Sequence, residues 1–298
     1  MTSGPHANTI LAADRLTLGY RRDHPVVRDL SLAVEAGEIV ALVGPNGSGK
    51  STLLRALARL MRPQRGTVTL NGQAIHRMNP RKVAQQLAIL PQNPAAPEDL
   101  TVRDLVARGR FARQAWWRPS THRDRDAIGW ALEMTGLEDF ATRRLSTLSG
   151  GERQRAWIAL ALAQEPRVLL LDEPTTFLDI SHQLEVMTLL QRLNREGDLS
   201  IVMVLHDLNQ AARFSHRLVA IHAGEVYAAG TPDEVLTEQM MREVFQVEGT
   251  IGRDPFAGTP IFTPLQSVRG RNGNSGRPDA APAGGPPVGE LAQLHHSE

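Results

Sequence analysis

Residues 44–51 form the stretch Gly-Pro-Asn-Gly-Ser-Gly-Lys-Ser, which matches the pattern G-x-x-x-x-G-K-[ST] of a phosphate-binding loop. The apolar run 39–43 predicts a buried strand before the loop, and the residues after it predict a helix that Pro63 ends. The apolar positions of that helix fall on one face: Leu53, Leu54, Leu57, Leu60 and Met61. No other feature limits the fold as strongly, because such a loop between a strand and a helix predicts an α/β core.

The glycines of this loop let the backbone turn tightly, so that N–H groups and a helix N-terminus point at an anion. Lys50 is placed to reach the β- and γ-phosphates of a nucleotide, and the Ser51 hydroxyl is placed to bind Mg²⁺. Lys50 and Lys82 are the only lysines of the chain, and a compact ammonium fits between phosphates where a planar guanidinium does not. The alternative, a glycine-rich turn without a ligand, is disfavoured by the strand and helix around it. The candidate nucleotide-binding residues here are Gly44, Asn46, Gly47, Ser48, Gly49, Lys50, Ser51 and Thr52.

The composition excludes several classes of protein. The chain has 298 residues, of which 41% are hydrophobic and 22% charged, as in soluble globular proteins. A net charge of +1 gives no support for a nucleic-acid binder, and the absence of cysteine excludes disulfides and thiolate metal sites. No apolar run approaches the length of about 18 residues that a membrane span needs, and residues 1–8 lack a signal-peptide pattern. Any membrane role is therefore expected to come through a partner.

The order of the expected elements favours a doubly wound α/β core beside an antiparallel β layer. Short strands are expected over 16–20, 30–34 and 67–70, and Asn71-Gly72 after the last of these predicts a hairpin. Continuous apolar runs at 168–171 and 201–205, with a helical pattern at 183–193 between them, are typical of parallel strands buried on both faces.

Two further regions differ from this core in pattern. Residues 99–148 are mostly helical in pattern, with Pro119 and Gly136 as breaks. From about Gln266 the chain becomes rich in Gly, Pro, Ala and Asn, and it has too few large apolar residues to offset the entropy of ordering. We therefore expect residues 266–298 to form a disordered tail.

Two short segments add candidate chemistry to the phosphate loop. The apolar run 168–171 ends in Asp172 and Glu173; in nucleotide hydrolases with such a loop, the first carboxylate holds Mg²⁺ through water and the second polarises the attacking water. Ser149 is a good N-cap, and Gly150 and Gly151 after it leave backbone N–H groups open to an anion. Taken alone, each segment has an ordinary alternative: acidic residues at an exposed strand end, and a simple helix cap.

Residues 148–154, Leu-Ser-Gly-Gly-Glu-Arg-Gln, resemble the signature sequence of ATP-binding cassette (ABC) ATPases. The resemblance extends over residues 9–263. It implies a P-loop NTPase (RecA-like) core, an antiparallel β subdomain, and an α-helical subdomain inserted at about 93–150. The family also implies that the protein hydrolyses ATP with Mg²⁺.

The resemblance implies a role for five further positions. Tyr20 matches the aromatic residue that stacks on adenine, although a core strand tyrosine would look the same in sequence. Gln92 matches the glutamine that senses the γ-phosphate and Mg²⁺, and Asp179 lies in the loop that crosses to a second subunit. His206 matches the switch histidine at the γ-phosphate, where the ordinary alternative is a structural histidine. Glu173 is then the general base.

In this family two copies pack head to tail, so the resemblance implies a homodimer that holds two ATP molecules. Each ATP is expected between the Lys50 loop of one copy and residues 149–151 of the other. Lys50, Mg²⁺ and His206 would stabilise charge in the transition state. ATP would thus join the copies, and hydrolysis would release them.

Other segments are similar to the ATPases of iron-chelate importers, which serve ferric siderophore, haem and vitamin B12 systems. These segments are 174–183, 100–110 and 205–211. This resemblance implies a peripheral protein at the cytoplasmic face of the cell (inner) membrane. It also implies permease subunits docked near residues 92–125, where Trp116-Trp117 is an unusual pair, and an indirect partner in an extracytoplasmic solute-binding protein.

Three functions remain open from sequence. The first is an importer ATPase for ferric siderophores or related chelates, and the second is the same chemistry for haem, cobalamin or a metal ion. The third is a soluble ABC ATPase that acts on nucleic acid or ribosomes. One cassette, no heptads and a net charge of +1 disfavour the third.

Overall fold

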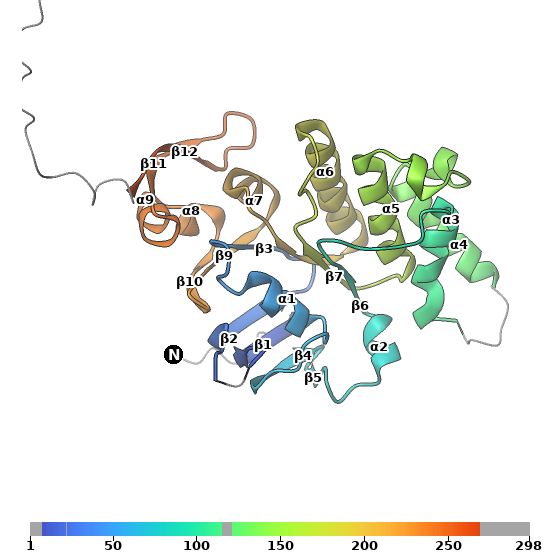
Figure 1. Cartoon of the computed structure of the whole chain (residues 1–298), viewed down its shortest axis with the longest axis horizontal. Helices are drawn as coiled ribbons and strands as arrows, with labels where there is room; N and C mark the ends of the chain where they lie inside the picture. Colours follow the sequence, from blue (N-terminus) through green and yellow to red (C-terminus); the bar gives the residue numbers. More distant parts are fainter. Residues whose placement is uncertain (1–7, 22, 115–120, 269–298) are drawn as a thin grey trace, which may run out of the picture.

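The structure is a computed structural model that describes residues 8–21, 23–114 and 121–268. Two sheets form its core, and the large helices lie on the side of the central sheet away from the antiparallel sheet, apart from α1 between the two (Figure 1). The predicted residues Trp116 and Trp117, the break at Pro119 and the tail from 269 onward lie outside the described residues.

The central sheet has six strands in the order β10-β9-β3-β8-β7-β6. Its strands are β3 (Ile39–Val43), β6 (Leu87–Leu90), β7 (Val168–Asp172), β8 (Ser200–Val204), β9 (Arg217–His222) and β10 (Glu225–Gly230). Strands β3, β7 and β8 are buried at every position, and they pair in parallel with Ile39 beside Ile201. The continuous apolar runs therefore predicted these strands correctly, because parallel strands covered on both faces need apolar side chains throughout.

The antiparallel layer that the sequence predicted is a four-stranded sheet in the order β2-β1-β4-β5. Its strands are β1 (Thr9–Leu18), β2 (Val27–Glu35), β4 (Arg65–Leu70) and β5 (Gln73–Ala74). Asn71 and Gly72 both have positive φ, 49° and 74°, as a two-residue hairpin requires, so the predicted hairpin is confirmed. Strand β1 ends at Leu18, so the expected strand over 16–20 is too long by two residues.

Helix α1 (Lys50–Leu57) is shorter than the sequence predicted. Arg59 adopts φ 65°, its N–H bonds the carbonyl of Ala56, and the N–H of Leu60 bonds the carbonyl of Arg55. These two bonds close the helix in a Schellman motif well before Pro63. Leu60 is consequently 67% exposed, and its expected place on the buried face was wrong.

Longer helices follow strand β6 along the chain. They are α3 (Val102–Ala107), α4 (His122–Met134), α5 (Gly150–Ala163), α6 (Ile180–Gly197) and α7 (Leu208–Phe214). Helix α6 contains the predicted segment 183–193, and Gly136, with φ 63°, follows the end of α4 as the predicted break. The short helices are α2 (Pro80–Ala84), α8 (Pro232–Val235) and α9 (Glu238–Met240). Within the described ranges, no helix is both long and apolar enough to cross a membrane.

A buried ion pair between Arg110 and Asp124 connects two segments of the helical region. Arg110 and Asp124 are only 1% and 3% exposed, and the Nε of Arg110 lies 2.8 Å from the Oδ1 of Asp124. Arg110 also donates to Glu165 and to the carbonyl of Ala163 at the end of α5. Burial alone would raise the pKa of Asp124, but hydrogen bonds from Thr121 and Arg110 outweigh it and lower this pKa to about 2. Asp124 is therefore ionised, and its charge is matched inside the protein.

The described chain ends in a hairpin of β11 (Val247–Arg253) and β12 (Pro260–Ser267). Ser267 pairs with Val247, so Gln266 and Ser267 belong to the folded part, and the expected boundary at 266 was too early. Asn209 of α7 holds this hairpin, because its side chain donates to the carbonyl of Phe262 and accepts from the N–H of Phe262. The end of the folded region is thus attached to the helix that follows His206.

Candidate nucleotide site

The phosphate loop joins β3 to α1 and leaves the N-terminus of α1 open. Gly44, Gly47 and Gly49 have φ of 148°, 79° and 104°, conformations that side-chain-bearing residues rarely adopt. Helix α1 has no side-chain cap at Gly49 and no acidic residue in its first turn. Its first N–H groups are therefore not capped by a side chain, and a phosphate can satisfy them.

Gly44 is the most restricted glycine of the loop. A Cβ added there would lie 2.2 Å from the backbone carbonyl oxygen of Ile221, whereas one added at Gly47 would meet no heavy atom within 4 Å. We expect Gly44→Ala to weaken ATP binding by at least about tenfold, because the loop must shift to relieve that contact. Gly47→Ala, also at a positive φ but with open space around the added Cβ, is the comparison variant. ATP titration of both variants measures this difference, and equal affinities would contradict the steric argument.

Lys50 is held by the loop itself. Its Nζ donates to the carbonyls of Gly44 and Pro45 at 2.8 and 2.9 Å, and the residue is 5% exposed. Burial lowers the pKa of Lys50, while the nearby charges of Glu173 and Asp172 act to raise it. Carbonyl partners orient the ammonium without neutralising it, so its charge is available to phosphate oxygens.

Ser51 and Asp172, both predicted to hold Mg²⁺, lie next to each other. The Ser51 hydroxyl donates to Oδ1 of Asp172 at 2.9 Å, and Asp172 is 6% exposed. Burial raises the pKa of Asp172, and the Ser51 hydrogen bond opposes this shift. A hydroxyl and a buried carboxylate side by side fit Mg²⁺, which is usually bound through one or two carboxylates together with substrate phosphates. The described residues contain no group of three or more acidic, His or Cys side chains around one point, as a protein-only metal cage would need.

Glu173 collects three partners at the end of β7. Its Oε1 lies 2.5 Å from Nε2 of His206, and its Oε2 accepts from Gln92 at 2.6 Å and from Thr176 at 3.0 Å. Glu173 also has φ 55°, so the chain turns sharply there. The structure thus brings Glu173, Gln92 and His206 together from three segments far apart in sequence. Thr176 was missed; its only sequence signal is its position three residues after Glu173.

Residues 149–151 lie beside the loop that contains Asp179. Ser149 caps α5 by accepting from the N–H of Glu152, and Glu152 bonds the N–H of Ser149 in return. A Cβ on Gly151 would lie 2.0 Å from the ring of His182, and His182 Nδ1 lies 2.8 Å from Asp179. The signature segment and the Asp179 loop therefore form one surface, which His182 joins. No hydrogen bond between described residues links Ser149 to the phosphate loop.

Tyr20 lies at the surface near α1. It is 67% exposed, and its hydroxyl accepts from Arg55 at 3.0 Å. The alternative reading of Tyr20 as a core strand aromatic is therefore wrong. An exposed ring held by a guanidinium offers a face on which a base can stack.

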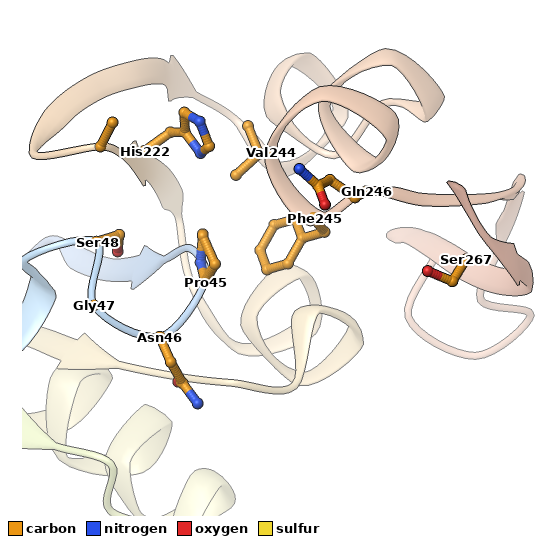
Figure 2. A pocket seen from close by; sticks show the side chains of 10 residues that line it. Pro45, Asn46, Gly47, Ser48, His222, Val244, Phe245, Gln246 and Ser267 are labelled. Carbon is orange, nitrogen blue, oxygen red and sulfur yellow. The ribbon is translucent and has the colours of Figure 1, made fainter. Parts of the chain in front are cut away.

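A cavity of about 480 Å³ lies between the phosphate loop and the segment after α9. Figure 2 shows Pro45 and Ser48 on one side and Val244 and Phe245 on the other, with the Phe245 ring toward Pro45. The Ser48 hydroxyl is buried, and none of the described residues forms a hydrogen bond with it. Residues 244–246 therefore lie across this cavity from the phosphate loop at Ser48.

Comparison with known proteins identifies the family. The family model described as ABC transporter matches residues 27–176. The chain belongs to the ABC transporter family. Its match includes the phosphate loop, the signature segment and the carboxylates at the end of β7.

Curated relatives of this ABC protein cover most of its length. The Iron(3+)-hydroxamate import ATP-binding protein FhuC of Bacillus subtilis (strain 168) is 49% identical over 251 residues, 84% of this chain and 93% of the relative. The Ferric enterobactin transport ATP-binding protein FepC of Escherichia coli (strain K12) is 44% identical over 265 residues, 89% of this chain and 97% of the relative.

Solved structures agree with the P-loop fold. A chain from an inward-facing metal-chelate type ABC transporter superposes with a TM-score of 0.76 at 27% identity, and the match covers 87% of this chain and 98% of that one. The dimeric ATP-binding cassette MJ0796 bound to ADP and Pi gives a TM-score of 0.65 at 28% identity over 74% of this chain and 98% of that chain. The chain is thus an ABC ATPase subunit that binds ATP.

Proposed function

We propose that the protein is the ATP-hydrolysing subunit of a membrane ABC importer for ferric siderophores or related iron chelates. The observation that carries the hydrolytic part is Glu173, which contacts His206, Gln92 and Thr176 at the end of β7. The sequence identity of 44–49% to FhuC and FepC, over more than four fifths of the chain, supports the iron-chelate cargo.

In the proposed site, ATP binds along the phosphate loop, and Tyr20 stacks on the adenine. Lys50 turns its ammonium to the β- and γ-phosphates. Ser51, Asp172 and Gln92 would hold Mg²⁺, which supplies positive charge against the phosphate oxygens.

Hydrolysis uses Glu173 as the general base. Its carboxylate takes the proton of the water that attacks the γ-phosphorus, as the bond to the β-phosphate oxygen breaks. His206 lies against Oε1 of Glu173 at 2.5 Å, and in our proposal it contacts the γ-phosphate and orients this carboxylate. Gln92 and Thr176 hold the other oxygen, so the base has one defined orientation.

Two copies would complete each site. We propose that residues 149–151 and Asp179 of one copy face the phosphate loop of the other, because α5 begins there with backbone N–H groups suited to the γ-phosphate. ATP then contributes charge-assisted contacts to both copies and makes closure depend on nucleotide.

The proposed domain organisation has three parts. The ABC ATP-binding domain begins at residue 9 and includes β12, which ends at Ser267, the helical subdomain at about 93–150 is inserted into it, and the residues after 268 are a tail outside the catalytic unit. Permease subunits dock near residues 92–125 and place the protein at the cytoplasmic face of the membrane, with the solute-binding protein acting indirectly. Haem, cobalamin or a metal ion is the second candidate cargo, and cobalamin has the support of the Cobalamin import ATP-binding protein BtuD of Halobacterium salinarum (strain ATCC 29341 / DSM 671 / R1), which is 39% identical over 240 residues, 80% of this chain and 60% of that relative.

Uptake of radiolabelled ferric siderophore in cells lacking the protein tests this function. We expect the wild-type sequence to restore uptake and Glu173→Gln to fail at equal expression. If uptake of ferric siderophore does not depend on the protein, the proposed cargo would instead be haem, cobalamin or a metal ion. Uptake restored by both sequences would contradict the role of Glu173.

Truncation tests the assignment of the tail. We expect a chain ending at Val268 to keep the ATPase activity and the thermal midpoint of the full chain, because β12 ends at Ser267. Removal of β12 as well, by ending at Thr259, is the contrasting variant and should destabilise the protein, because Phe262 is buried and bonded to Asn209. Loss of activity in the first variant would show that the tail belongs to the working unit.

A further inference from the structure

Two glutamines join α6 to α7 beside the site. The Nε2 of Gln210 donates to Oε1 of Gln183 at 2.5 Å, and the Nε2 of Gln183 donates to the carbonyl of Leu178 at 2.9 Å. Both side chains are partly buried. An unbroken chain of hydrogen bonds therefore runs from the backbone of loop 174–179 to α7.

The contacts fix the orientation of both amides. The carbonyl of Leu178 can only accept, so Gln183 must direct its nitrogen there and its oxygen toward Gln210. Gln210 must then present its nitrogen, and no described residue bonds its buried Oε1.

One end of the chain of bonds reaches the catalytic contact. The N–H of Gln210 bonds Asp207, the N-cap of α7, at 2.9 Å, and Asp207 directly follows His206. A small cavity of about 130 Å³ is lined by both glutamines, by Glu173 and by His206. A shift of Gln210 therefore moves the turn that carries His206.

The other end reaches an exposed surface. Leu178 lies between Asp179 and Phe177, and Phe177 is 90% exposed with φ 65°. The side chain of Leu178 approaches Gly150, because a Cβ there would lie 3.6 Å from it. Residues 149–151 and this loop therefore lie side by side, where one partner surface can contact both.

We propose that Gln183 and Gln210 are positioning residues that couple loop 174–179 to His206. The inference rests on the proposed ATP-driven dimer. When the second copy presses on Phe177 and Asp179, the carbonyl of Leu178 moves, and the two amides carry this displacement into the first turn of α7. That turn sets the distance between His206 and Glu173, so hydrolysis awaits the partner. Continuous hydrogen-bond networks can carry such coupling.

If the two glutamines have this role, their replacement changes the turnover number but not the affinity for ATP. Neither glutamine contacts the phosphate loop, so ATP binding by one copy does not depend on them. If the pair only fastened α6 to α7, its loss would lower the thermal midpoint and leave the turnover of the folded protein unchanged. If the pair positions His206, kcat falls while the affinity for ATP stays.

The test uses the full chain and three substitutions at the pair. Gln183→Glu keeps the shape and still accepts from Gln210, but it cannot donate to the carbonyl of Leu178. Gln210→Leu removes the bond between the two side chains, and a Gln183→Glu/Gln210→Leu double variant completes the comparison. Gln191→Leu on the same helix α6 is the matched control, because within the described part of the chain the Gln191 side chain is hydrogen-bonded to Arg195 alone. For each we measure kcat, KM for ATP, ATP affinity by titration, and thermal midpoint.

We expect kcat to fall by about tenfold in Gln183→Glu and in Gln210→Leu, with ATP affinity within about twofold of wild type. The double variant should be no slower than the slower single variant, because one pathway has been broken twice. Wild-type kcat in both single variants would overturn the inference, and so would losses that multiply or that accompany weaker ATP binding. A wild-type chain that binds ATP without hydrolysing it would instead overturn the proposed function, and the inference with it.

Discussion

Glu173→Gln is expected to lower ATP turnover by about a hundredfold to ten-thousandfold while leaving ATP affinity near that of wild type. Glutamine keeps the length and can still accept from Gln92 or Thr176, but it cannot take a proton from water. The carboxylate contacts no residue of the phosphate loop through a hydrogen bond, so nucleotide binding should survive.

The same variant should accumulate as a dimer in ATP and Mg²⁺, because closure is reached and hydrolysis no longer reverses it. Size-exclusion chromatography with light scattering, with and without ATP, measures this state. Glu133→Gln, an exposed position on α4, is the matched control and should match wild type in both assays. Normal turnover in Glu173→Gln would assign the base elsewhere.

Arg110→Met is expected to lower the free energy of unfolding by about 3–5 kcal/mol, because it leaves the carboxylate of Asp124 buried without its ion partner. Urea unfolding measures the loss. Arg108→Met, two residues earlier and exposed, is the control and should change little. A double variant, Arg110→Met with Asp124→Leu, should recover part of the loss, because an apolar pair carries no unpaired charge.

Acid should weaken the same interaction in a defined range. The pKa of Asp124 is lowered to about 2 in the folded protein from its ordinary value of 3.8. A lowered carboxyl pKa stabilises the fold above the unfolded pKa, and this contribution is lost as the pH falls through the folded value. The stability difference between wild type and Arg110→Met should therefore shrink between about pH 4 and pH 2. A difference that stayed constant over that range would show that the charge of Asp124 is not what Arg110 stabilises.

Local sequence patterns predicted the parts of the fold that local physics decides. The run 168–171 is a buried parallel strand because such a strand needs apolar side chains on both faces. Asn71-Gly72 is a hairpin because both residues accept positive φ. The end of α1 could not be seen, since it depends on Arg59 taking a left-handed conformation that its residue type does not favour.

Contacts between segments far apart in the sequence could not be predicted from local patterns. Gln92 and His206 could be assigned only by family resemblance and Glu173 also by its place after an apolar strand, but the meeting of all three depends on the tertiary structure. Thr176, Gln183 and Gln210 have ordinary polar side chains whose importance appears only once α6 and α7 are packed. Gln266 and Ser267 lie beside a stretch of tail-like composition, yet pairing with β11 places them in the fold.

The near absence of lysine makes this protein unusually suited to amine-directed labelling. Lys82 is exposed on α2, whereas Lys50 is buried, held by two carbonyls and needed for phosphate. A mild acylating dye should therefore attach at Lys82 and the α-amino group, while bound nucleotide shields Lys50. Lys82→Arg would remove the reactive amine at Lys82. An amine-reactive fluorophore or cross-linker would then attach at the α-amino group alone, without a cysteine having to be introduced.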